Sequence, residues 1–329
     1  MPEIPDQVRN DKFRKVENIP RGNFADEKTG GDSVSQNLQL ATCHLQPVRV
    51  KINFPATRAQ ISAPEKFQLF GDEKKLGEFK KIDLQISGRE VQFRGPEDFL
   101  MQKFKVVRAV ASADEILEIE NFENRPSWNL NLNDNKFFGI LEMRIVDGKL
   151  IFINELPLEK YLLGVAESPE SDHFEKQKAM AILARSYAAF YLKPENRKFP
   201  DAPFDLDDSP NHCQKFLGAN FAARAPNWIR AVNSTENLVV KFRGELVKTP
   251  YFNSSDGMTR SAKTVWGWEN APYLSAVRDP AGTGGKLNGH GVGLSGTGAQ
   301  KMATDGKKFD EIIHYFYRGV EIGKLNSAE

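Results

Sequence analysis

Short alternations of apolar and polar residues dominate the chain from about Pro47 onward. Clusters of Gly, Pro, Asp or Lys separate these runs, a pattern typical of β-strands. The predicted strands read VRVKINF, KFQLFG, KIDLQIS, EVQFRG and KFKVVRAV. Residues 137–156 add two alternating runs that meet at Asp147-Gly148, a residue pair that favours the type I′ turn of a β-hairpin. The pattern therefore predicts a β-rich layer over residues 47–156.

Helical periodicity begins at Leu158. PLEKYLLGVAES forms a short predicted helix that starts after Pro157. A longer helix is predicted over 172–193, where Asp172 and Glu175 resemble a capping box. Its predicted inner face consists of Ala179, Leu183, Ser186, Tyr187 and Phe190.

Further helices are predicted near 219–233 and, as one amphipathic segment, over GAQKMATDGKKFDEIIHYFYRG. Two strands, LVVKF and ELVKTPYF, lie between them. Because the helices follow the strands, the sequence predicts an α+β fold.

The first 45 residues are polar and rich in turn-forming residues, so we expect them to be disordered. They lack the basic start and apolar stretch of a signal peptide. No apolar run is long enough for a membrane-spanning helix. The formal net charge of +1 gives no indication of a nucleic-acid partner.

The stretch NGHGVGLSGTGAQKMA (288–303) contains the spelling G-x-G-x-x-G. A dinucleotide site needs a preceding strand and a parallel sheet that continues after the loop. Here the preceding residues are coil-like, and the chain after Gly296 is too short for such a sheet. The glycines instead permit positive φ angles and close approach of another group to His290. A tight turn with an incidental histidine is the alternative.

Two polar segments contain further candidate site residues. Glu167 lies just before Pro169 and ahead of the long helix, where the chain must bend. It is either a carboxyl presented in a cleft or a solvated carboxylate near a helix N-terminus. In YFNSSDGMTRSAKTVWGW (251–268), small hydroxyl residues precede Trp266 and Trp268. Polar turns beside aromatic faces suit sugars, although the tryptophans also fit a core.

The segment DLDDSPNHCQKFLG contains three potential metal ligands: Asp207, His212 and Cys213. Adjacent His and Cys fit poorly into a standard structural zinc site, and a fourth ligand is not evident. A nucleophile built on Cys213 or Ser255 with His290 is a further possibility.

Taken together, these motifs resemble the SpoIID/LytB family of bacterial cell-wall proteins. The resemblance covers residues 137–322, so we expect a catalytic core over 137–325, a β-rich lead-in over 46–136 and a separate N-terminal segment over 1–45. Glu167 in ESP corresponds to the catalytic glutamate of the family's E-M-P element. Arg185 in ILARSYA corresponds to the family's A-A-R-T/S-Y. The loop at 251–268 and the stretch around His290 match two further family motifs.

The resemblance implies a set of substrate-binding residues besides Glu167. They are Arg185, Ser254, Ser255, Asp256, Thr259, His290, Gly291 and Ser295. Three departures from the family pattern stand out. The spacing from Gly164 to Glu167 is shorter, and Gly296 and Thr297 replace the usual Gln and Tyr. Asp207 stands where zinc-binding members have a cysteine, so no cofactor is expected.

The implied activity is that of a lytic transglycosylase, which cleaves peptidoglycan glycan strands and leaves 1,6-anhydro-MurNAc ends. The sugar's own 6-hydroxyl attacks, so one carboxyl, Glu167, suffices as general acid and base. A cell-envelope location follows from such a substrate. The alternatives are a peptidoglycan-binding protein without catalysis, an enhancer of a partner cell-wall amidase, and a Ser or Cys hydrolase.

Overall fold

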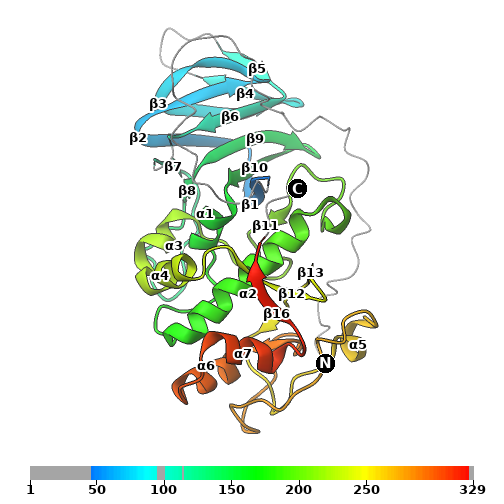
Figure 1. Cartoon of the computed structure of the whole chain (residues 1–329). Coiled ribbons are helices and arrows are strands. Elements are labelled where there is room, and N and C mark those ends of the chain that lie inside the picture. The colour runs from blue at the N-terminus through cyan, green and yellow to red at the C-terminus, as the bar shows by residue number, and fades with distance from the viewer. Residues whose placement is uncertain (1–45, 95–100, 113–114, 326–329) are drawn as a thin grey trace. The chain divides into compact units, whose positions relative to one another are not determined.

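The computed structural model describes residues 46–94, 101–112 and 115–325, which have an α+β fold, as predicted (Figure 1). They divide into two compact units. The strand-rich unit contains the described residues up to Val165 together with Arg197–Phe221, and the helical unit contains Ala166–Asn196 and the chain from Ala222 onward. The contacts thus draw the division after Val165, whereas the sequence prediction draws it before residue 137. The segment 1–45, predicted to be disordered, lies outside the described residues.

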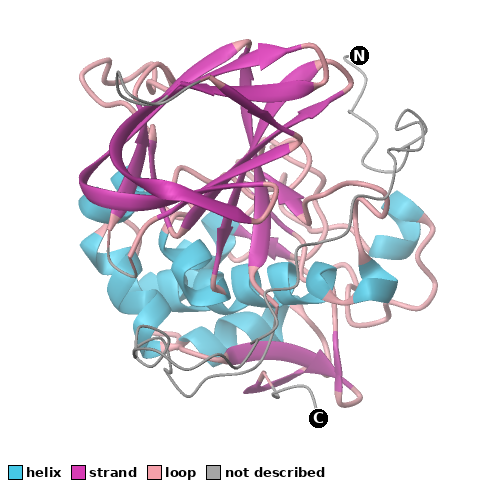
Figure 2. Cartoon of the chain, turned by 90° about the horizontal axis from the view of Figure 1, so that it is seen from above, coloured by secondary structure: helices cyan, strands magenta, loops and turns pink. Residues whose placement is uncertain are grey.

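One sheet organises the strand-rich unit. In the described residues its strands follow the order β11-β1-β10-β9-β6-β2-β3-β4-β5, with β7 pairing β2 and β8. Their bounds are β1 Val48–Ala56, β2 Arg58–Gly71, β3 Lys74–Ser87, β4 Glu90–Arg94, β5 Gln102–Phe104, β6 Val106–Val110, β7 Ile116–Ile119, β8 Lys136–Phe138, β9 Ile140–Val146, β10 Lys149–Leu156 and β11 Leu206–Asp207. The predicted strands are confirmed with two exceptions. KFKVVRAV is divided at Lys105 between β5 and β6, and ELVKTPYF contains two short separate strands, Glu245–Leu246 and Tyr251–Phe252. Figure 2 shows this sheet curling strongly around its own interior.

The core of this unit comes from the alternation that the sequence displays. Phe67, Phe93, Phe137 and Phe152 are fully buried, one from each of four strands. The β9–β10 hairpin has the predicted two-residue turn, because Val146 pairs with Lys149 and both turn residues have positive φ. Those angles, 50° at Asp147 and 72° at Gly148, are the type I′ geometry.

An ionic cluster lies inside the same sheet. Cross-strand registers bring Arg49 opposite Glu155 and Arg108 opposite Glu142. The Glu142 carboxylate contacts Arg49 Nη2 at 2.9 Å and Arg144 Nε at 2.8 Å. Arg108 Nη2 lies 2.7 Å from Glu155, which also pairs with Arg49. Removing one carboxylate would therefore take away a negative charge that several buried guanidinium groups share.

The helical unit is built around α2 (Phe174–Leu192), which contacts α4 (Pro226–Ser234), α6 (Gly296–Thr304), α7 (Phe309–Phe316) and strand β12 (Leu238–Phe242). Every residue from Ala179 to Ser186 is buried, so α2 has more than one inner face. The predicted face is therefore incomplete, and two of its members, Tyr187 and Phe190, are half-buried. Within the described residues no helix is long and apolar enough to cross a membrane.

The remaining elements are short. They are α1 Leu158–Leu163, the 3-10 turn η2 Pro194–Asn196, α3 Ala219–Arg224, α5 Ala262–Trp266, β13 Glu245–Leu246, β14 Tyr251–Phe252, β15 Leu294–Ser295 and β16 Glu321–Lys324. Strand β12 pairs with β13 and β16, and β14 pairs in parallel with β15.

Three helix predictions require correction. The segment 219–233 is two helices, because Pro226 begins α4. The final segment is also two helices, which separate at Gly306 with its φ of 90°. The cap of α2 is His173, whose Nδ1 accepts the Glu175 N–H at 3.2 Å, so the predicted Asp172 capping box does not form.

Candidate functional site

Glu167 lies half-buried in the loop that precedes α2. The Ser168 hydroxyl donates to Asp172 Oδ2 at 2.6 Å, and Lys176 Nζ lies 2.7 Å from the same oxygen. Gln177, which is fully buried, donates to the Pro169 carbonyl at 2.9 Å. Lys176 and Gln177 of α2 therefore hold the loop, through Asp172 and through the Pro169 carbonyl. These contacts fix the backbone that carries Glu167.

Two further contacts join this loop to the rest of the helical unit. The Asn227 N–H donates to Glu170 Oε1 at 3.0 Å, which ties the loop to the first turn of α4. The His173 N–H donates to Gln300 Oε1 at 3.0 Å, which ties it to α6. Sequence reasoning did not identify these positioning residues. The one available signal in the sequence is the four-residue spacing of Ser168 and Asp172, which allows their side chains to form a hydrogen bond.

Arg185 lies in the middle of α2 and is 0% exposed. Its Nη1 donates to the Leu238 carbonyl at 3.2 Å and its Nη2 to the Val232 carbonyl at 3.1 Å. The guanidinium therefore joins α2 to the end of α4 and the start of β12. A side chain without exposed surface does not touch a substrate in this conformation, so its geometry fits a positioning role.

The predicted SSDGMT loop divides into buried and exposed members. Ser255 and Thr259 are 3% and 2% exposed. The Ser255 hydroxyl donates to the buried Asp279 carboxylate at 2.6 Å, and Thr259 Oγ1 accepts the Val277 N–H at 2.9 Å. Both hydroxyls thus hold the loop in shape. Their burial does not support the predicted direct contact with substrate.

Ser254 and Asp256 remain accessible in this loop. Ser254 is half-buried and donates to the Lys286 carbonyl at 2.9 Å. Asp256 is exposed, and the hydrogen bond from Arg260 Nη2 at 2.7 Å lowers the pKa of its carboxyl. At neutral pH this loop therefore presents a carboxylate with an adjacent guanidinium.

The glycine-rich stretch lies directly beside this loop. The Arg260 N–H donates to the Gly291 carbonyl at 2.7 Å, and the Ser254 N–H donates to the Asn288 carbonyl at 3.3 Å. The structure therefore brings the two predicted motifs together.

His290, in the glycine-rich stretch, is half-buried, and its ring centroid lies 4.9 Å from that of Trp266. Its Nδ1 accepts the Val292 N–H at 3.0 Å. Burial lowers the pKa of His290 to about 4, although a hydrogen bond with the Tyr251 backbone opposes the shift. The imidazole is consequently neutral at pH 7, and because Nδ1 accepts a hydrogen bond, the ring proton is on Nε2.

The glycines of this stretch allow close approach of neighbouring segments of the same chain, and they do not bind a phosphate. A Cβ on Gly293 would lie 1.9 Å from the Pro250 carbonyl oxygen, and one on Gly289 would lie 2.8 Å from Phe252 Cβ. Ser295, which is fully buried, caps α6 by accepting the Gly298 N–H at 3.2 Å. Its predicted role in substrate binding is therefore not supported by exposure.

Tyr317 closes the base of both loops. Its buried hydroxyl donates to the Pro250 carbonyl at 2.6 Å and accepts the Leu294 N–H at 3.3 Å. Strands β14 and β15 begin at these points. The chain between Phe252 and Leu294 is thus a long segment of the helical unit whose two ends meet at Tyr317.

Asp207, His212 and Cys213 lie close together in the strand-rich unit. His212 Nδ1 is 2.8 Å from Asp207 Oδ2, and the Asp207 N–H points to Cys213 Sγ at 3.4 Å. His212 Nδ1 is therefore engaged by Asp207, and only Nε2 of this imidazole is left as a possible metal ligand. Across the residues that the structure describes, no cluster of His, Cys, Asp or Glu is arranged to hold a metal ion. The expectation that these residues hold no zinc stays a prediction.

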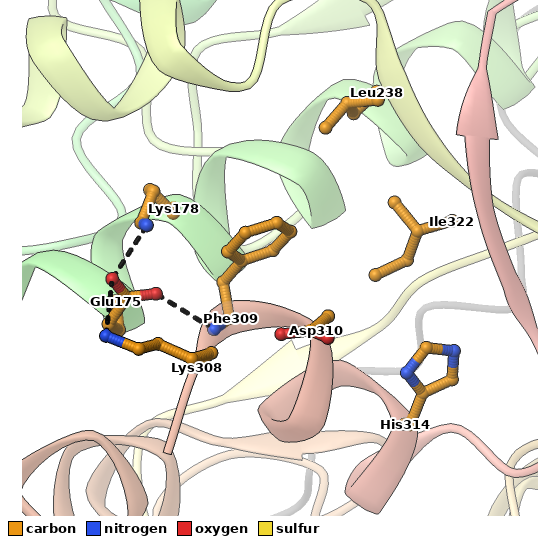
Figure 3. A pocket seen from close by; sticks show the side chains of 8 residues that line it. All are labelled: Glu175, Lys178, Leu238, Lys308, Phe309, Asp310, His314 and Ile322. Atoms are coloured by element: carbon orange, nitrogen blue, oxygen red, sulfur yellow. Dashed lines mark hydrogen bonds and ion pairs between the residues drawn. The ribbon is translucent and has the colours of Figure 1, made fainter. Parts of the chain in front are cut away.

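A pocket of about 590 Å³ opens elsewhere in the helical unit, at the start of α2 and α7 (Figure 3). Glu175 anchors its polar side through Lys178 Nζ at 2.7 Å and the Phe309 N–H at 3.1 Å. Leu238 and Ile322 supply apolar walls from β12 and β16. None of the residues predicted to act on a substrate lines this pocket.

The chain is similar in sequence to known proteins. The family model described as SpoIID, stage II sporulation protein, matches residues 146–242. Stage II sporulation protein D of Bacillus amyloliquefaciens is 22% identical over 264 positions, which cover 53% of this chain and 76% of the relative. The Bacillus subtilis protein of that name is 21% identical over 264 positions, with 53% and 77% covered. An uncharacterised protein of Brachyspira hyodysenteriae is 30% identical over 160 positions, covering 47% of this chain and 40% of its own.

The matched segment contains Glu167, the loop that holds it and Arg185. Over this segment the chain is similar to the SpoIID family.

Proposed function

We propose that the protein is a lytic transglycosylase of the bacterial cell wall, with Glu167 as its general acid and base. The observation that carries this proposal is the position of Glu167. The residue is half-buried on a loop fixed by Ser168, Asp172 and Gln177, inside the segment that matches the SpoIID family. A fixed, partly desolvated carboxyl is what a proton-transfer step requires.

In the proposed reaction Glu167 first donates its proton to the oxygen that links MurNAc to GlcNAc. The bond between that oxygen and C1 of MurNAc breaks as positive charge develops on the sugar ring. The 6-hydroxyl of the same MurNAc forms the new bond to C1 and gives its proton to the Glu167 carboxylate. The product is a 1,6-anhydro-MurNAc end, and the enzyme regains its starting protonation state.

The other residues of the site have two kinds of role in this proposal. Ser254 and Asp256 are accessible and contact the glycan. Gly291 and the side chains of Arg185, Ser255, Thr259 and Ser295 are buried, so they position the loops without touching it. His290 is neutral with its Nδ1 engaged, so it shapes the site and does not exchange the catalytic proton. A cell-wall substrate implies a location in the cell envelope.

Mass spectrometry of the products from purified sacculi tests the proposal. Glu167→Gln should lower the release of anhydro-muropeptides by about 10²-fold or more, the typical contribution of proton transfer. Asp305→Asn is the control, because it changes an exposed carboxylate of the helical unit that pairs with Lys301. Unchanged release from Glu167→Gln would refute the assignment. Sacculus binding without any anhydro ends from the wild type would favour a binding protein or amidase enhancer.

A further inference from the structure

A row of half-buried aromatic side chains in the helical unit has no role in the proposed reaction. Trp266 and Trp268 lie with ring centroids 4.5 Å apart, and Trp266 in turn lies 4.9 Å from His290. The left-handed Gly267, with φ of 71°, ends α5 and lets Trp268 turn back toward Trp266. The tryptophan pair therefore extends directly from the imidazole of the candidate site.

Lys248 continues the row on its other side. Its Nζ lies 4.5 Å from the ring centroid of Trp268, 5.4 Å from that of Phe190 and 5.6 Å from that of Tyr191. Tyr191 contacts Tyr187 one helical turn earlier on α2, with centroids 4.9 Å apart. One ammonium group thus joins the tryptophan pair to the rings of α2.

The exposure of these side chains distinguishes them from the core. Trp228 is 0% exposed and Phe252 is 6% exposed. By contrast Trp266, Trp268, Lys248 and Tyr191 are all half-buried, so each keeps part of its surface in contact with solvent. Such a group of rings, held in place by mutual contacts, is a preformed surface that binds a ligand with little loss of side-chain entropy.

We infer that Trp266, Trp268 and Lys248 form an additional binding platform for a carboxylate-bearing, β-1,4-linked amino-sugar strand, an inference that rests on the proposed function. The C–H groups on a pyranose face are apolar and weakly positive, and they complement the negative face of an indole ring. The ammonium of Lys248 complements the carboxylates of the lactyl groups. The platform holds sugar units beyond the bond that is cleaved, so it sets affinity for long strands.

Binding measurements in the Glu167→Gln background separate this inference from catalysis. The probes are peptide-free glycan strands from purified sacculi and β-1,4-linked N-acetylglucosamine oligomers, which lack carboxylates. Trp268→Ala should weaken binding of both probes about tenfold, and Trp268→Phe should restore most of it. Lys248→Met should weaken binding of the carboxylate-bearing strands about fivefold and leave the oligomers unchanged. Trp128→Ala, which removes a ring that is 73% exposed in the strand-rich unit, is the control.

Turnover gives the second readout. In the otherwise wild-type chain, Trp268→Ala should raise KM for glycan strands several-fold and leave kcat within twofold, whereas a merely structural tryptophan would lower kcat together with thermal stability. Unchanged affinity and KM in Trp268→Ala would overturn the platform even if Glu167 proves catalytic. Equal losses for both probes in Lys248→Met would overturn its role as the carboxylate partner. Undiminished anhydro release from Glu167→Gln would refute the proposed function and leave the binding results to be judged separately.

Discussion

In the strand-rich unit, charged side chains share the interior of one sheet, where Glu142 and Glu155 face Arg49, Arg108 and Arg144. The helical unit instead buries single polar groups that satisfy the backbone or one another. Arg185 donates to two carbonyls, and Ser255 donates to Asp279. A network of charges constrains a sheet whose strands already pair. Isolated hydrogen bonds hold loops that have little regular structure, and those loops carry the accessible groups of the candidate site.

Removing one charge from the network should have the largest effect on stability. Glu142→Gln leaves Arg49 and Arg144 without their shared carboxylate, so the free energy of unfolding of the strand-rich unit should fall by about 3–5 kcal/mol. Hydrogen exchange read unit by unit measures this change. The control is Glu118→Gln, whose carboxylate is 34% exposed beside Lys136 and whose loss should cost less than about 1 kcal/mol. Equal effects of the two variants would contradict the importance of the network.

Acidification should affect the two units in opposite directions. The pKa of His290 is about 4 in the folded chain, below its ordinary 6.5, so the unfolded chain binds the proton first. The contribution of His290 to the free energy of unfolding of the helical unit is therefore complete above pH 6.5 and falls between pH 6.5 and 4. Burial raises the pKa of Asp208 in the strand-rich unit from 3.8 to about 6, so its folded form binds the proton first. The contribution of Asp208 to the free energy of unfolding of the strand-rich unit is complete below pH 3.8 and is lost as the pH rises through 6.

Each of these contributions amounts to about 3 kcal/mol, from about 1.4 kcal/mol per pKa unit. Hydrogen exchange between pH 4 and 7, corrected for the intrinsic pH dependence of exchange, measures both slopes. His290→Asn should remove the slope of the helical unit, and Asp208→Asn that of the strand-rich unit. The same slope in the wild type and the His290→Asn variant would show that this histidine does not control the pH response.

The smallest expected effect concerns two neighbouring serines. Ser255→Ala removes a hydrogen bond to the buried Asp279 carboxylate, which should cost the helical unit about 2 kcal/mol. Ser254→Ala removes only a hydrogen bond to the Lys286 carbonyl and should cost about 1 kcal/mol or less. Thermal unfolding and KM for glycan strands should then separate the pair. Ser255→Ala should lower stability, whereas Ser254→Ala should raise KM. The reverse result would mean that the buried serine contacts substrate.

Local patterns in the sequence predict most of the strands and one hairpin turn. Asp147-Gly148 specifies its hairpin because few other residue pairs adopt two positive φ angles. Pro226 and Gly306 were equally readable, yet the helical periodicity on either side masks the breaks that they cause. The parallel pairing of β1 with β11 joins segments about 150 residues apart, and no local pattern announces it.

The candidate site was predictable by residue type but not by exposure. Ser255, Thr259 and Ser295 carry the hydroxyls expected of a sugar site, yet contacts far along the chain bury all three. The glycines predict close approach of another group to His290, whereas the neutral state of its ring depends on burial, which no local pattern indicates. Lys248 was missed because its partners Phe190 and Trp268 come from separate parts of the sequence.

Tyr317 couples the two ends of the chain between β14 and β15. One phenol joins them, through Pro250 and Leu294, and it comes from the residue that follows α7. A change at Tyr317 would therefore disturb the SSDGMT loop and the stretch around His290 together, although this residue belongs to neither.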